Sequence, residues 1–167
     1  AVVQKYLREA KADELVQVWD MNNAPGNEKA KLYKCVVLFD ESVIDKESFL
    51  NINNPMEVSM EYEILQEVFQ PIPQLHFFNE RGENAFISYG HSLEEFDERN
   101  AQKIAPGKYK SVVKIPQDVF NAGTYYISVG LIELKFREII FYQEHCLSLT
   151  LEEDLEKREF VYMDRVE

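Results

Sequence analysis

The stretch of sequence that decides the fold is Val58-Ser59-Met60-Glu61-Tyr62-Glu63-Ile64. Apolar residues occupy its even-numbered positions and polar residues its odd-numbered positions. Successive side chains of a β-strand point to opposite faces, so a period of two predicts a strand with one buried and one solvated face. Half-buried strands of this kind are typical of antiparallel sheets.

Six further segments outside this stretch are rich in β-branched and aromatic residues and are separated by Pro, Gly and Asn. We expect strands at 31–39, 75–79, 85–89, 109–115, 124–131 and 146–151. We expect 135–143 to form a connection or an irregular strand. Seven short strands at this spacing predict an all-β fold, an immunoglobulin-like antiparallel β-sandwich. Its predicted core includes Tyr62, Phe77, Tyr125, Ile127, Val129 and Leu149.

The N-terminal residues have a different period. Val2, Val3, Tyr6 and Leu7 recur at helical spacing, which predicts a short N-terminal helix continuing to about Trp19. We therefore expect residues 1–27 to be a linker helix and loop from a preceding domain, 28–151 to be the sandwich, and 152–167 to be a C-terminal tail. The sequence starts with Ala rather than Met, and we expect it to be part of a longer protein.

The charge balance and the cysteines exclude several function classes. Thirty acidic residues against 18 basic ones give a net charge of -12, which repels nucleic-acid phosphates, so we expect no nucleic-acid partner. Only Cys35 and Cys146 are present, far apart and without a CxxC motif, so we expect free thiols and no zinc site. The first residues lack an apolar export core, and no stretch approaches 18 apolar residues. We expect a cytoplasmic location.

Motifs for catalysis are missing. The sequence contains no GxxxxGK[ST], GxGxxG, HExxH or GxSxG. Glu61 and Glu63 share one predicted strand face, and paired carboxylates can hydrolyse glycosides. On a strand that alternates so regularly we favour a solvated face for them. We expect no enzymatic activity, no cofactor and no metal.

Rings and hydroxyls on outward strand positions form the candidate ligand site. In an immunoglobulin-type sandwich the third, sixth and seventh strands lie side by side in one sheet. That arrangement places five residues on one exposed surface, with Tyr89 at its edge: His76, Phe78, Tyr126, Ser128 and Ser148. Apolar faces of a pyranose stack on rings, and its hydroxyls take hydrogen bonds, so a sugar suits this surface. The alternative is that a terminal segment or a second subunit covers it.

Several segments also resemble a known family. Ala105-Pro106-Gly107-Lys108-Tyr109, Ile115-Pro116 and the run from Asn121 to Gly130 resemble the C-terminal domain of the ATP-binding subunit of O-antigen polysaccharide ABC transporters, the Wzt type. Segments 56–63 and 75–82 fit the same pattern. The opening residues 2–7 are similar to the helix that leaves that family's nucleotide-binding domain. The resemblance covers about residues 1 to 151.

The resemblance implies a specific role. In that family the domain is a β-sandwich that binds the finished, undecaprenyl-linked O-polysaccharide in the cytoplasm. It recognises the modified non-reducing end and couples this recognition to export by a membrane transporter subunit at the inner face of the inner membrane. Related domains form homodimers, in some cases by exchanging a terminal strand. The ATPase motifs belong to the N-terminal half of the full protein, so we expect no ATP hydrolysis by this chain. The alternative function is a protein-interaction or dimerisation module.

Overall fold

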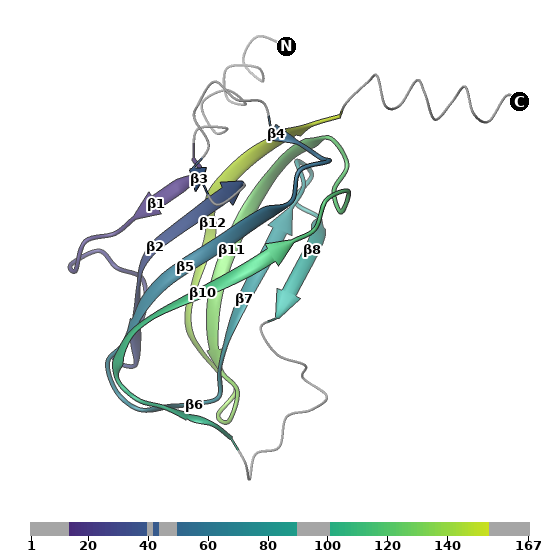
Figure 1. Cartoon of the computed structure of the whole chain (residues 1–167). Coiled ribbons are helices and arrows are strands. Elements are labelled where there is room, and N and C mark those ends of the chain that lie inside the picture. The colour runs from purple at the N-terminus through teal and green to yellow at the C-terminus, as the bar shows by residue number, and fades with distance from the viewer. Residues whose placement is uncertain (1–13, 40–41, 44–49, 90–100, 154–167) are drawn as a thin grey trace, which may run out of the picture.

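The fold is a sandwich of two β-sheets. The computed structural model describes residues 14–39, 42–43, 50–89 and 101–153. All secondary-structure elements in these residues are β-strands, and this confirms the all-β prediction (Figure 1). The alternation of apolar and polar residues explains this result, because each sheet needs one apolar face to bury against the other.

Each sheet has five strands. The first has the order β1 (Val16–Val18), β2 (Ala30–Phe39), β5 (Met56–Ile64) and β10 (Gly107–Ile115), with the short β3 (Ser42–Val43) beside β2. The second has the order β4 (Leu50–Asn51), β12 (Glu138–Glu152), β11 (Gly123–Glu133), β7 (Pro71–Phe78) and β8 (Asn84–Tyr89). A separate small pair consists of β6 (Val68–Phe69) and β9 (Lys103–Ile104).

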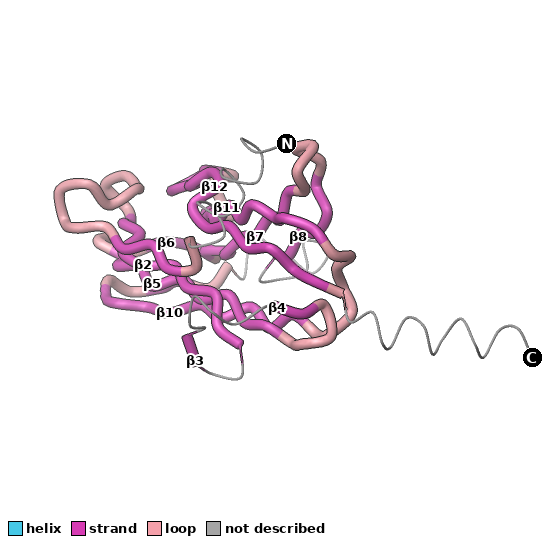
Figure 2. Tube along the Cα trace, turned by 90° about the horizontal axis from the view of Figure 1, so that it is seen from above, coloured by secondary structure: helices cyan, strands magenta, loops and turns pink. Residues whose placement is uncertain are grey.

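The two sheets lie in separate layers, as the view from above shows (Figure 2). The expected third, sixth and seventh strands correspond to β7, β11 and β12, and they are neighbours in one sheet as predicted. Strand pairs are antiparallel with one exception among the described strands: β4 runs parallel to β12, where Leu50 lies opposite Leu151. This division of the strands is the one expected of an immunoglobulin-like sandwich.

The core between the layers contains the six residues predicted for it. Their exposed fractions are 0% for Phe77, Ile127, Val129 and Leu149, 6% for Tyr125 and 7% for Tyr62. The two cysteines also lie in this core, on β2 and β12, and both thiols are free. The hydrogen bond with Cys146 and then burial raise the pKa of the Cys35 thiol, so it stays protonated.

The helix prediction is wrong where the described residues test it. Val16–Val18 forms strand β1, which pairs with β2, and Leu15 is buried in the core. Val37 N donates to Leu15 O at 2.9 Å, so tertiary pairing decides the conformation of this segment against its helical pattern. Residues 1–13, which carry the rest of the predicted helix, lie outside the described residues. The segment expected to be a linker therefore contributes a strand to the sandwich.

The segment 135–143, expected to be a connection or an irregular strand, contains both. Only a turn at residues 134–137 separates β11 from β12, and β12 then continues unbroken over 15 residues. The sequence pattern obscured this because the register of the pair shifts between Ile127 and Val129 and again between Leu131 and Ile132. A shift of this kind breaks the period of two that identifies a strand.

A buried ion pair closes one end of the sandwich. Lys29 Nζ donates to Glu133 Oε1 at 2.6 Å and to Glu138 Oε2 at 2.5 Å, and the side chain of Glu133 is only 1% exposed. Glu133 Oε2 accepts a hydrogen bond from Phe69 N at 2.9 Å. The hydrogen bonds that Lys29 donates to these two glutamates raise its pKa above the ordinary value. The contacts join the segment before β2 to β6 and to the β11–β12 turn.

Lys29→Met is expected to lower the free energy of unfolding by about 3 kcal/mol, because it leaves the Glu133 carboxylate buried without its cation. Urea unfolding followed by circular dichroism measures this change. Lys114→Met is the control, since Lys114 pairs with Glu57 at 3.6 Å but its side chain is 80% exposed. An exposed pair contributes about 1 kcal/mol or less. Equal losses in the two variants would contradict the role assigned to Lys29.

Candidate functional site

The outer face of the second sheet brings together the six residues predicted for the ligand site. The register places His76 opposite Ser128, and Tyr126 opposite both Phe78 and Ser148. Tyr89 lies on the same face, on the edge strand β8. Their strand neighbours, such as Ile127 and Phe77, point into the core.

His76 is the centre of a cluster of rings on this face. Its ring centroid lies 6.2 Å from that of Phe78, 6.2 Å from that of Tyr89 and 5.5 Å from that of Tyr142. Its Nδ1 and the hydroxyl of Tyr142 form a hydrogen bond of 3.1 Å. Four aromatic side chains from β7, β8 and β12 are therefore held in one array by the pairing of their strands.

Two ring residues of this cluster were not predicted from the sequence. Tyr142 lies opposite Gly130, and His145 lies at the irregular point of β12 with φ of 47°. The ring of His145 is 5.1 Å from that of Phe78 and 5.5 Å from that of Tyr126. The bulge re-aims His145, as bulges beside functional sites often do. The one feature of the sequence that indicated this bulge was the break in the alternation of polar and apolar residues between Gln143 and Cys146.

Gly130 makes room for Tyr142. A Cβ at Gly130 would lie 3.0 Å from Cδ2 of Tyr142 and 3.2 Å from the carbonyl oxygen of Phe141. A side chain at this position would force the Tyr142 ring or the Phe141 carbonyl to shift by a few tenths of an ångström. The absence of a side chain at Gly130 therefore helps to accommodate the ring of Tyr142 in the cluster.

The two serines do not lie on the exposed surface, and this part of the prediction is wrong. Ser128 is 0% exposed and Ser148 is 1% exposed. The hydroxyl of Ser128 accepts a hydrogen bond from the backbone N of His145 at 2.9 Å, so it holds the bulge in place. Hydroxyls available on this face come instead from the tyrosines, of which Tyr89 is 42% and Tyr142 is 38% exposed.

We use the name aromatic surface for six side chains on this face: His76, Phe78, Tyr89, Tyr126, Tyr142 and His145. Burial lowers the pKa of His76 below its ordinary value of 6.5, so its ring is neutral at neutral pH. Among the described residues no partner is present for His76 Nε2, which is buried. The surface is therefore an array of rings, with the tyrosines Tyr89 and Tyr142 partly exposed on it.

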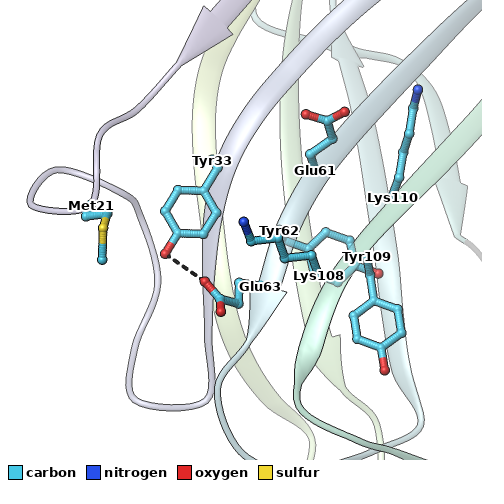
Figure 3. Close-up of a pocket in the computed structure, with 8 residues that line it drawn as sticks. All are labelled: Met21, Tyr33, Glu61, Tyr62, Glu63, Lys108, Tyr109 and Lys110. Atoms are coloured by element: carbon cyan, nitrogen blue, oxygen red, sulfur yellow. Dashed lines mark hydrogen bonds between the residues drawn. The ribbon is translucent and has the colours of Figure 1, made fainter.

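Glu61 and Glu63 lie on the opposite sheet, on the outer face of β5 as predicted. They line a pocket of about 550 Å³ together with Tyr33, Lys108 and Lys110, and we call it the charged pocket (Figure 3). Neither carboxylate belongs to the aromatic surface, so the two outer faces of the sandwich have different chemistry.

In the described part of the chain no group of His, Cys, Asp or Glu is placed to hold a metal ion. No helix there is long and apolar enough to span a membrane.

Comparison with known proteins supports the fold. No family model and no curated protein matches the chain. Among solved structures the chain is similar to the crystal structure of the C-terminal domain of Wzt, with a TM-score of 0.62, 14% identity and 77% of each chain covered. A β-glucuronidase of Bacteroides uniformis matches with a TM-score of 0.48 and 7% identity, over 70% of this chain and 13% of that one. The likeness to the Wzt domain confirms the predicted resemblance at the level of fold.

The low pKa of His76 predicts a pH dependence. Its folded-state pKa is below 6.5, so between these two values the unfolded chain binds more protons than the folded chain. The contribution of His76 to stability therefore falls as the pH is lowered below 6.5. NMR titration of the imidazole signals is expected to give a midpoint for His76 below 6.5. A midpoint at or above 6.5 would show that the ring is not desolvated by the cluster.

Proposed function

We propose that this chain is a non-catalytic carbohydrate-binding module that holds a polysaccharide on the aromatic surface. The observation that carries the proposal is the array of six rings on the outer face of four paired strands. Aromatic faces contact the apolar C–H face of a pyranose, and tyrosine hydroxyls exchange hydrogen bonds with its hydroxyl groups. Neither interaction needs a charge, and both repeat along a chain of sugars.

The rigidity of the surface favours binding. The ring of His76 is held by its hydrogen bond to Tyr142, and the backbone of His145 is held by its hydrogen bond to Ser128. Side chains that are already ordered lose little conformational entropy when a ligand binds. Each sugar nevertheless buries little area and must give up water, so the affinity for a short oligosaccharide is expected to be weak.

Within this class we propose that the ligand is an O-antigen polysaccharide, recognised at its modified non-reducing end. Two observations support this narrower proposal: the resemblance of the segments around Gly107 and Gly123 to the Wzt type, and the likeness of the fold to the C-terminal domain of Wzt. In this proposal the chain acts in the cytoplasm as a homodimer. It confers substrate specificity on an ABC exporter through a membrane transporter subunit.

A protein-interaction or dimerisation surface is the second candidate. It is favoured by the apolar side chain of Ile87, which is 41% exposed on the same face, and by Ile139 at the start of β12, which is 61% exposed. Exposed apolar area is also found at protein interfaces. Measuring the mass of the chain in solution, with and without polysaccharide, separates the two candidates, because a dimer that uses this face cannot also bind sugar there.

Tyr126→Ala is expected to weaken binding of the purified O-polysaccharide by about 1–2 kcal/mol, because it removes one ring from the aromatic surface. Calorimetry or NMR titration measures the loss. Tyr125→Ala is the matched control from the same strand: Tyr125 is 6% exposed in the core, and its hydroxyl donates to Asn121 O at 2.8 Å. This control is expected to lower the thermal midpoint, whereas Tyr126→Ala leaves the midpoint close to that of the wild type.

Unchanged affinity in Tyr126→Ala, with its fold intact, would place the binding site elsewhere on the sandwich. The same titration of Tyr89→Ala then tests the exposed rim of the aromatic surface. If both variants bind as the wild type does, the aromatic surface is not the polysaccharide site.

A further inference from the structure

The charged pocket lies on the sheet that the proposed function does not use. It has a volume of about 550 Å³ and opens on the outer face of β2, β5 and β10 (Figure 3). Its lining includes Met21, which is 83% exposed, and Tyr33, whereas Tyr109 lies opposite Tyr62 and its ring packs against the core. A pocket of this size accommodates one or two sugar units rather than a long chain.

A bulge in β2 builds one wall of the pocket. The register between β2 and β5 shifts between Leu32 and Lys34, and this makes Tyr33 an extra residue in the strand. The hydroxyl of Tyr33 donates to Glu63 Oε2 at 3.3 Å. Burial, with Glu63 beside it, raises the pKa of Tyr33, so the phenol remains a hydrogen-bond donor.

The strands around the pocket are basic, although the chain as a whole is acidic. β2, β5 and β10 together carry five lysines and three glutamates, in a chain with a net charge of -12. In the sheet register Glu61 lies between Lys34 and Lys110, and Glu63 lies between Lys31 and Lys108. The lining of the pocket itself is balanced, with Lys108 and Lys110 against Glu61 and Glu63, so the excess of positive charge lies on the strands around it. Positive charge around a site attracts anions from solution.

The two lysines that line the pocket differ from Lys114 in their ion pairing. Lys114, further along β10, pairs with Glu57 of β5 at 3.6 Å. Lys108 and Lys110 have the same cross-strand relation to Glu63 and Glu61, but within the described residues they form no ion pair. Figure 3 shows Lys108 and Glu63 near Tyr33, and Lys110 with Glu61 toward the other end of the pocket. Two ammonium groups and the oxygens of Glu61 therefore remain available to a ligand.

We propose that the charged pocket binds a single anionic sugar unit, a pyranose that carries a carboxylate or a phosphate group. Lys108 and Lys110 pair with the anionic group through charge-assisted hydrogen bonds. The carboxylates of Glu61 and Glu63 accept hydrogen bonds from the sugar hydroxyls, and the ring of Tyr33 contacts its apolar face. This site is separate from the aromatic surface, because it lies on the other sheet.

NMR titration of the full chain, labelled with ¹⁵N, tests the proposal with four probes: galacturonate, glucose 6-phosphate, galactose and inorganic phosphate. We expect at least one of the two anionic sugars to shift the amide signals of Lys108 and Lys110. Comparing galacturonate with glucose 6-phosphate shows whether the pocket prefers a carboxylate or a phosphate. Galactose and inorganic phosphate are expected to bind more weakly, because galactose has no anionic group and inorganic phosphate has no sugar ring. Added salt is expected to weaken the binding of the anionic sugar.

Variants of three lysines on one strand locate the site. Lys108→Gln and Lys110→Gln are each expected to weaken binding of the anionic sugar about tenfold, the effect of losing one hydrogen bond to a charged group. Lys114→Gln is the matched control and is expected to bind as the wild type does, because Lys114 lies outside the pocket. Tyr126→Ala is also expected to retain this binding, which separates this site from the polysaccharide site.

Three results would overturn the proposal. The first is that galactose shifts the same signals with the same affinity, because an anion would then not be needed. The second is that inorganic phosphate binds as tightly as glucose 6-phosphate, because a sugar would then not be needed. The third is that Lys108→Gln and Lys110→Gln both bind the anionic sugar as the wild type does. Any of these three results would leave the outcome of the Tyr126→Ala experiment unaffected. The anionic-sugar site and the polysaccharide site are therefore tested independently.

Discussion

The double pairing of β11 is the constraint on which the rest of the structure depends. β11 forms antiparallel ladders with β12 on one side and with β7 on the other. Its core face, with Ile127, Val129 and Leu131, is completely buried, so a slip of one residue would expose this face and bury the other. The fixed register of β11 places Tyr126 and Gly130 on the outer face. It thereby decides which side chains of β7 and β12 meet there.

The sequence allowed the sandwich to be predicted because its regular strands follow a strict period of two. Tyr62 and Ile127 were assigned to the core from this period alone. Tyr126 and His76 were assigned to one outer face from the period together with the strand order of an immunoglobulin-like sandwich. His145 and Tyr33 were not recognised because each lies at a bulge, where the pattern is interrupted and the pairing partner decides the direction of the side chain. The burial of Ser128 depends on the chain passing over it at His145, and alternation within a single strand contains no information about that contact.

The two outer faces of the sandwich differ in how they can recognise a ligand. The aromatic surface presents rings on the outer face of a sheet, which suits a repeating neutral chain. The charged pocket presents Lys108 and Lys110 in a concave site, which suits one anionic unit. In each sheet a bulge delivers a side chain to the outer face, His145 in one and Tyr33 in the other. Irregular positions in an otherwise regular fold thus contribute to both candidate sites.

The central claim is that the aromatic surface is where the chain holds a polysaccharide. The most direct measurement is a map of amide signals of the ¹⁵N-labelled chain during titration with lipid-free O-polysaccharide from the strain that encodes it. Our account predicts that the largest changes fall on β7, β8, β11 and β12, around His76, Tyr89 and His145, with few changes on β2 or β5. Changes confined to β2, β5 and β10, or no changes at saturating polysaccharide, would contradict it.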